Sequence, residues 1–261
     1  MPPVRLLPAL ARIVALGTLF SSFAAAGLVV DDRFDDGDPT GSAAHPGFWK
    51  LQTVTGDNGV FENNGYLTLF AVKQAYSFAG LNSRLDEQLN FFTQAVTIAV
   101  EDLLLEHKDI PNHEAVFRLS LNSTELRQNM SPQSVSLRFV PGLVLFGYKT
   151  NHIDKLAAED LTGLKPGSVI FERFEGRATG FSLTLDPFAE PGHITVTLVL
   201  TTDGPRPEIT RTARLNLRRS DWVSGGASAL VMEARRNHGV VAEDSYMSAS
   251  VGRLTITNYK R

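Results

Sequence analysis

The stretch "FSLTLDPFAEPGHITVTLVL", from Phe181 to Leu200, contains two segments in which apolar and polar residues alternate. Phe181–Leu185 places phenylalanine and leucine at every second position, with serine and threonine between them. Ile194–Leu200 repeats the pattern with isoleucine, valine and leucine against threonine. Because successive side chains of a strand point to opposite faces, each segment predicts a half-buried β-strand with one dry and one wet face. The "PG" pair at 191–192 between them is typical of a turn.

The same period of two recurs along most of the chain. It is clearest in "VFRLSL" (116–121) and "SVSLRF" (134–139), and turn clusters such as "GDNG", "ENNG" and "DGPRP" separate the candidates. Further candidate strands are 29–34, 48–53, 65–72, 75–81, 92–106, 168–174, 211–218, 229–235 and 247–257. About a dozen strands without intervening crossover helices predict an all-β fold, an antiparallel two-sheet jelly-roll sandwich. One short helix is expected at 151–163, and one helical turn at Arg84–Asn90.

The first 26 residues have the order of a secretory signal peptide. Arg5 and Arg12 come first, an apolar run follows from Ile13 to Phe20, and Ala24–Ala26 closes the segment. The alternative is a membrane anchor, but the run is shorter than the roughly 20 apolar residues that a span needs. We expect cleavage near Ala26, which leaves residues 27–261 as a single β-sandwich domain, secreted or periplasmic and without a membrane span.

Composition excludes several kinds of function. Without Arg5 and Arg12 the chain keeps 23 basic residues against 28 acidic ones, a formal charge of −5. This mildly acidic balance argues against a nucleic-acid partner. Cysteine is absent, which excludes thiol catalysis and zinc–thiolate sites.

Three segments near the termini carry a resemblance to a known group of proteins. "DDRFDDGD" (31–38), "PGFWKL" (46–51) and "GVFENNGYLTL" (59–69) resemble the opening of concanavalin A-like, or laminin G-like, jelly rolls. The C-terminal "YMSASVGRLTITNYKR" looks like the closing strand of such folds. The resemblance implies two stacked, curved antiparallel sheets, often with a carbohydrate-binding concave face. Lectins, hydrolases, lyases and adhesion modules share this architecture, so fold alone does not assign an activity.

The acidic run after the first strand allows two interpretations. Asp35, Asp36 and Asp38 surround Gly37 and offer the hard oxygen ligands that calcium prefers, and laminin G-like folds often carry calcium. Aspartate and glycine also form ordinary solvated turns. No fixed ligand spacing is present, so the solvated turn is favoured. Val29–Phe34 should then be the first strand, paired antiparallel with residues 251–257, with Phe34 in the core.

Candidate ligand-binding residues are scattered. Trp222 lies in the polar segment "RRSDWVSGG", which predicts an exposed ring able to stack on a sugar. Arg118, Arg138 and Tyr148 are residues that a sugar-binding groove could use, and arginines at 218, 219, 235 and 236 could meet an acidic polysaccharide. Glu101 and Asp102 are adjacent, so they point to opposite faces and do not form the paired carboxylates of a glycoside hydrolase.

Three functions remain open. The first is a non-catalytic module that binds a carbohydrate or cell-surface component, with glycan as partner. The second is a polysaccharide-active hydrolase or lyase. The third is a structural extracellular or envelope protein. The first is preferred because no linear catalytic motif is present. The sequence establishes no cofactor, and calcium at the acidic run is the candidate.

Overall fold

The computed structural model describes residues 27–42, 45–51, 58–72, 78–110, 115–123, 133–149, 168–215, 217–222, 225–236 and 244–260. The expected signal segment and the expected helix at 151–163 lie outside these residues. Within them, the single helical element is the 3₁₀ turn η2 (Arg219–Asp221), and no helix is long and apolar enough to cross a membrane. Apart from turns and irregular connections, the described residues are therefore nearly all in strands, which confirms the all-β prediction.

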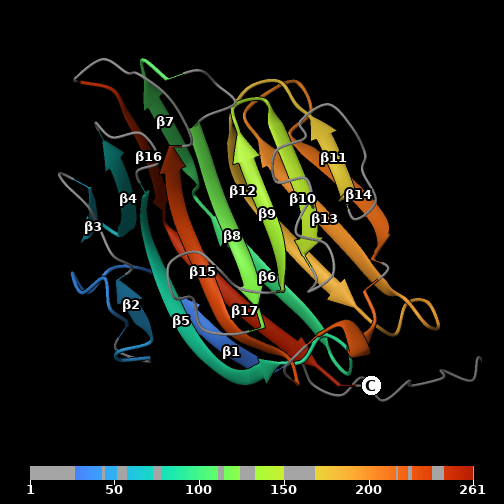
Figure 1. The fold of residues 1–261 in the computed structure, drawn as a ribbon. Helices are drawn as coiled ribbons and strands as arrows, with labels where there is room; N and C mark the ends of the chain where they lie inside the picture. The colour runs from blue at the N-terminus through green and yellow to red at the C-terminus, as the bar shows by residue number, and fades with distance from the viewer. Residues whose placement is uncertain are drawn as a thin grey trace, which may run out of the picture.

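The strands form three antiparallel sheets, and the two larger sheets stack face to face (Figure 1). The seven-stranded sheet has the order β11 (Ser168–Arg173), β10 (Leu143–Lys149), β9 (Ser134–Val140), β8 (Ala115–Asn122), β15 (Ala227–Arg236), β5 (Phe78–Leu89), β2 (Trp49–Leu51). The six-stranded sheet has the order β1 (Gly27–Asp32), β17 (Arg253–Tyr259), β6 (Ala95–Glu101), β12 (Ala178–Asp186), β13 (Ile194–Thr202), β14 (Glu208–Leu215). The four-stranded sheet has the order β3 (Gly59–Asn63), β4 (Tyr66–Val72), β16 (Tyr246–Val251), β7 (Leu104–Lys108).

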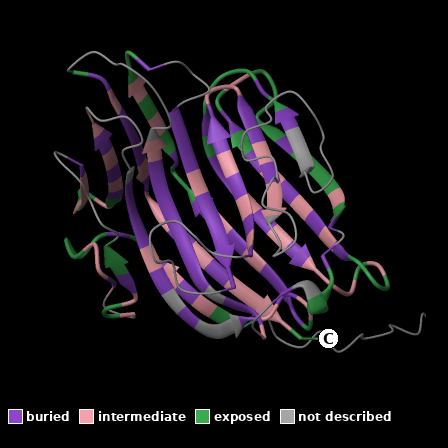
Figure 2. Cartoon of the chain, in the orientation of Figure 1, coloured by how far each residue is buried: buried purple, intermediate pink, exposed green. Residues whose placement is uncertain are grey.

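The alternating segments at 181–200 form two neighbouring interior strands of the six-stranded sheet. β12 and β13 pair with Leu183 opposite Leu198, and both side chains are buried, while the threonines between them are half-buried. Across the sandwich, the rings of Phe139 and Phe181 lie 4.7 Å apart, so the two large sheets share one core. Figure 2 shows how buried positions alternate with more exposed ones along these strands.

The first and last strands pair as predicted. β1 lies antiparallel to β17 with Val30 opposite Ile256, and Val30 and Phe34 are both buried. The strand ends at Asp32 because Phe34 adopts a left-handed backbone conformation, with φ of 51°. The Asp32 carboxylate holds this turn: it accepts the Phe34 N–H at 3.1 Å and the Trp49 Nε1–H at 3.1 Å. Burial raises the pKa of Asp32.

The four-stranded sheet arises from a bend in two long segments. Residues 92–106 and 247–257, each expected as one strand, divide into β6 and β7 and into β16 and β17. Asp102, with φ of 54°, breaks the first segment, and Gly252 breaks the second at the same place. A Cβ on Gly252 would lie 2.8 Å from the Asp102 Cβ, so the close approach of the two bends requires glycine.

The prediction of a helical turn at Arg84–Asn90 is wrong. These residues, up to Leu89, continue β5, which pairs with β15 and buries Leu81, Leu85 and Leu89 completely. Leucines four residues apart fit one face of a helix and also alternate positions of a strand. Long-range pairing with β15 decides between the two.

Candidate functional site

The seven-stranded sheet carries polar and charged side chains on the face turned away from the six-stranded sheet, here called the outward face. In β8, β9 and β15 every second residue joins the core, and the residues between them point outward. On these three strands the outward residues are Val116, Arg118, Ser120, Asn122, Ser134, Ser136, Arg138, Val140, Ala229, Val231, Glu233 and Arg235.

Backbone register aligns three charges in one row across the sheet. Glu233 on β15 is directly opposite Arg118 on β8, which is directly opposite Arg138 on β9. Arg235 is the next outward residue on β15. We call Glu233, Arg118, Arg138 and Arg235 the charged row.

Glu233 lies at the centre of the ion pairs. Its Oε1 is 2.8 Å from Nε of Arg118 and 3.0 Å from Nε of Arg235. The Glu233 side chain is completely buried and that of Arg118 is 13% exposed. Neither N–H points well at the carboxylate, so both oxygens of Glu233 lack a hydrogen bond from the described residues. A buried carboxylate in this state retains unused capacity to accept hydrogen bonds.

The charged row carries more positive than negative charge. The guanidinium groups of Arg118 and Arg235 lie against the Glu233 carboxylate, and Arg138 adds a third on the next strand, so these four side chains have a formal charge of +2. Burial lowers the pKa of Arg118, while Glu233 opposes that effect, and arginine remains protonated in proteins. Arg118 and Arg138 are like charges directly opposite each other on neighbouring strands, an arrangement that is destabilising by itself.

Two different surfaces flank the charged row. On one side, Asn82, Ser120 and Ser136 supply amide and hydroxyl groups, and Asn82 Oδ1 is buried without a hydrogen bond from the described residues. On the other side, an apolar cluster contains Val116, Val140, Leu143 and Leu145. Charge, hydroxyl groups and an apolar surface are therefore adjacent on one face of the sheet.

The structure brings together two of the four predicted ligand-binding residues, Arg118 and Arg138. Tyr148 is opposite Val135 in the ladder between β9 and β10, and it packs against the core on the other face of the sheet. Placing Tyr148 in a groove with the two arginines is therefore wrong. Arg118 and Arg138 lie opposite each other on the neighbouring strands β8 and β9, so they share the outward face. Tyr148 lies two positions from Phe146 on β10, so it faces the core as Phe146 does.

The prediction that Trp222 is exposed is also wrong. Its side chain is 3% exposed, and its Nε1–H donates to the Gly226 carbonyl at 2.8 Å. The ring packs edge-on against Phe91 at 5.1 Å, while Arg219 lies over Phe92 at 5.8 Å. The polar neighbours of Trp222 in the sequence gave no sign of these phenylalanines, which come from a turn about 130 residues earlier.

Sequence reasoning missed Glu233 as a site residue. The signal was present in "LVMEAR" (230–235), where Leu230, Met232 and Ala234 alternate with Val231, Glu233 and Arg235. The first three are fully buried in the core, so the other three must face outward. A glutamate between two core positions of a strand is a reason to look for its charge partner.

The acidic turn does not assemble a metal cage. Asp35, Asp36 and Asp38 are all exposed, and among the described residues no three histidine or acidic side chains converge as metal ligands. Asp38 Oδ1 accepts hydrogen bonds from the N–H and hydroxyl of Thr40 at 2.9 and 2.6 Å, which lower the pKa of Asp38. Asp36 Oδ1 accepts the Asp38 N–H at 3.0 Å. Because Asp36 and Asp38 accept hydrogen bonds from the turn itself, their arrangement is that of a turn rather than of a calcium site.

Comparison with known proteins places the fold but not a family. No protein-family model matches the chain, and no curated protein matches it. Among solved structures, lectin I from Ulex europaeus, with the methyl glycoside of α-L-fucose, has a TM-score of 0.53 and 12% identity, over 90% of this chain and 98% of that chain. Winged bean acidic lectin, with methyl-α-D-galactose, has a TM-score of 0.53 and 11% identity, over 91% and 100%.

A third structure, of an endo-acting O-glycanase from the human gut microbiota, has a TM-score of 0.53 and 13% identity, over 88% of this chain and 98% of that chain. At such identities the likeness shows the fold alone. The concanavalin A-like jelly-roll architecture that the sequence resembles is confirmed.

Proposed function

We propose that the protein is a secreted, non-catalytic glycan-binding module that takes an anionic polysaccharide, bearing uronate or sulfate groups, on the outward face of its seven-stranded sheet. The observation that carries the proposal is the charged row, in which Arg118 and Arg235 pair with the buried Glu233 and Arg138 lies opposite Arg118 on the next strand. The geometry favours an anion because guanidinium groups bind carboxylate and sulfate through charge-assisted hydrogen bonds.

The flanks of the charged row suit a sugar. The half-buried amide of Asn82 and hydroxyl of Ser136 match the hydrogen-bonding groups of a pyranose, and the partly buried Leu145 of the apolar cluster suits its apolar face. The structural neighbours support a carbohydrate ligand by analogy, since two of them are lectins with bound glycosides.

A purely structural role explains the charged row less well. A buried ion pair is weak evidence for stability, because the cost of desolvation can exceed the attraction between the charges. One arginine would balance Glu233, whereas the row places two like charges directly opposite each other.

Calorimetric titration with a panel of polysaccharides tests the proposal. Polygalacturonate, alginate and chondroitin sulfate are the acidic probes, and dextran is the neutral one. We expect the protein to bind at least one acidic probe, more weakly as salt is added, and not to bind dextran. Arg138→Met, at a half-buried position, should weaken binding about 10- to 100-fold, as expected for loss of a hydrogen bond to a charged group.

Arg214→Met is the matched control. Arg214 is 64% exposed on β14 of the other large sheet, so this variant makes the same charge change away from the charged row. Equal weakening by both variants, or no binding of any acidic probe, would reject the site. Release of shorter chains from a bound probe, measured by size-exclusion chromatography, would favour the hydrolase or lyase alternative.

A further inference from the structure

A separate pocket lies where the four-stranded sheet meets the ends of the two larger sheets. Its volume is about 370 Å³. Four segments form its walls: β7, Tyr246 at the start of β16, the turn between β9 and β10, and the connection from β11 into β12. Ligand pockets in proteins usually measure about 300–1,000 Å³, so this one has room for a small molecule.

One wall is apolar. Leu105 on β7, Val140 on β9 and Phe174 after β11 line it together with Ala178. The Phe174 N–H donates to the carbonyl of Gly142 at 3.1 Å, which ties two of the four segments together. The shape of the pocket is therefore set by backbone contacts.

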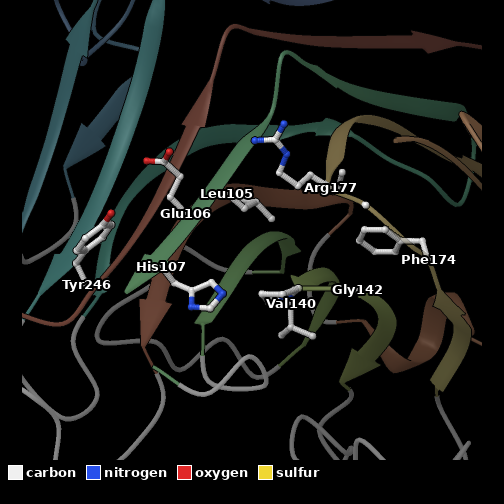
Figure 3. A pocket seen from close by; sticks show the side chains of 11 residues that line it. Leu105, Glu106, His107, Val140, Gly142, Phe174, Arg177 and Tyr246 are labelled. Carbon is white, nitrogen blue, oxygen red and sulfur yellow. The ribbon is translucent and has the colours of Figure 1, made fainter. Parts of the chain in front are cut away.

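His107 projects into the pocket from β7. Leu105 and His107 alternate with Glu106 along the strand, and Figure 3 shows both pointing toward Val140 and the turn at Gly142. The Nδ1 atom of His107 is buried and has no hydrogen-bond partner among the described residues. A buried ring nitrogen without a partner is costly, because it has lost its hydrogen bond to water.

Arg177 is held in place on the opposite wall. Asp203 accepts the Arg177 backbone N–H at 2.6 Å and its Nε–H at 2.8 Å, and these bonds lower the pKa of Asp203. Figure 3 shows the Arg177 side chain extending toward Leu105. Because Asp203 balances its charge, Arg177 offers directed hydrogen bonds without making the pocket strongly cationic.

Val140 connects the pocket to the outward face. It lines the pocket and also belongs to the apolar cluster beside the charged row. Val140 therefore places the pocket next to the apolar cluster that flanks the charged row.

We propose that this pocket is a subsite for a single hexopyranose unit, in which the apolar wall packs on the sugar ring while His107 Nδ1 and Arg177 hydrogen-bond its hydroxyl groups. The proposal rests on the glycan-binding function above for its ligand class. It adds a second site that recognises an uncharged sugar by shape and hydrogen bonding, whereas the charged row recognises anionic groups.

Saturation-transfer-difference NMR with single sugars tests the pocket by itself. The probes are the methyl glycosides of galactose, glucose and mannose, at the millimolar concentrations at which single sugars show weak binding. We expect at least one to bind the full-length protein. His107→Leu and Arg177→Met should each weaken that binding about five- to tenfold, as expected for one lost hydrogen bond.

Lys108→Met is the control from the same strand. Lys108 lies beside His107 but points to the other face of β7 and pairs with Asp244, so this variant should leave sugar binding unchanged. The pocket is rejected if no methyl glycoside binds, or if His107→Leu and Arg177→Met bind as the wild type does. It is also rejected if Lys108→Met weakens binding as much as they do.

The outcomes separate the two sites. Binding of an acidic polysaccharide that depends on Arg138, without binding of any methyl glycoside, supports the charged row and refutes the pocket. Binding of a methyl glycoside that depends on His107, without binding of any acidic probe, refutes the charged row and supports the pocket.

Discussion

Replacing Glu233 by glutamine should destabilise the protein strongly. The substitution keeps the shape of the side chain and removes the carboxylate charge that pairs with Arg118 and Arg235, at distances of 2.8 and 3.0 Å. With an effective dielectric constant of about 20, unit charges about 4 Å apart attract by about 4 kcal/mol. The free-energy cost of removing the charged groups from water offsets much of this attraction. Removing one partner of a buried pair typically costs about 3–5 kcal/mol, because the remaining charge stays uncompensated.

This loss is large enough to measure by thermal unfolding. In a domain of roughly this size, each kcal/mol lowers the melting temperature by about 2–4 °C, so Glu233→Gln should lower it by about 6–20 °C. Urea unfolding followed by circular dichroism should show the same decrease in the free energy of unfolding with an unchanged denaturant slope.

Two controls make the result specific to buried charge. Glu190→Gln removes a carboxylate that is 33% exposed and pairs with the exposed Arg214, so it should change the free energy of unfolding by about 1 kcal/mol or less. The triple variant Arg118→Met, Glu233→Leu, Arg235→Met removes all three charges and should recover most of the lost stability. A loss below about 1 kcal/mol for Glu233→Gln would refute the assignment of Glu233 as the electrostatic centre of the charged row.

Three further predictions follow from other parts of the sandwich. The Arg253 side chain donates hydrogen bonds to both carboxylate oxygens of Asp31, at 2.8 and 3.0 Å, and these bonds lower the pKa of Asp31. The pair therefore stabilises the fold above the ordinary aspartate pKa. This stabilisation is lost as the pH falls through the lowered pKa of Asp31. Arg253→Met should remove this pH-dependent part of the free energy of unfolding, which is about 1 kcal/mol for a partly exposed pair. Urea unfolding between about pH 2 and 6 measures it, and identical pH profiles of the variant and the wild type would contradict the prediction. Phe34→Ala should cost about 3–5 kcal/mol in the same assay because the ring is 1% exposed, and a loss under about 1 kcal/mol would show that Phe34 is not packed in the core. The melting temperature should be the same with excess calcium as with chelator, in the wild type and in Asp35→Ala and Asp38→Ala. A calcium-dependent rise in the wild type that both variants abolish would establish a metal site.

The face on which a residue lies was largely readable from the sequence. Alternation placed Leu183 and Leu198 in the core, and the same parity argument placed Phe34 there. This works because the direction of a side chain in a strand depends only on its position relative to its neighbours. The pairing of the first and last strands was also predicted, although that prediction came from a resemblance to known folds.

The sequence by itself therefore determined the class of fold and the two faces of each strand, while only the tertiary structure decided which residues meet. Glu233 and Arg118 are 115 positions apart, and they become ion partners because β15 lies between β5 and β8 in the sheet. The burial of Trp222 depends on Phe91 in the same way, and the pocket at His107 is formed by segments that are distant from one another in the sequence. Strand order and register are set by how the whole core packs, so no local pattern of residues encodes them.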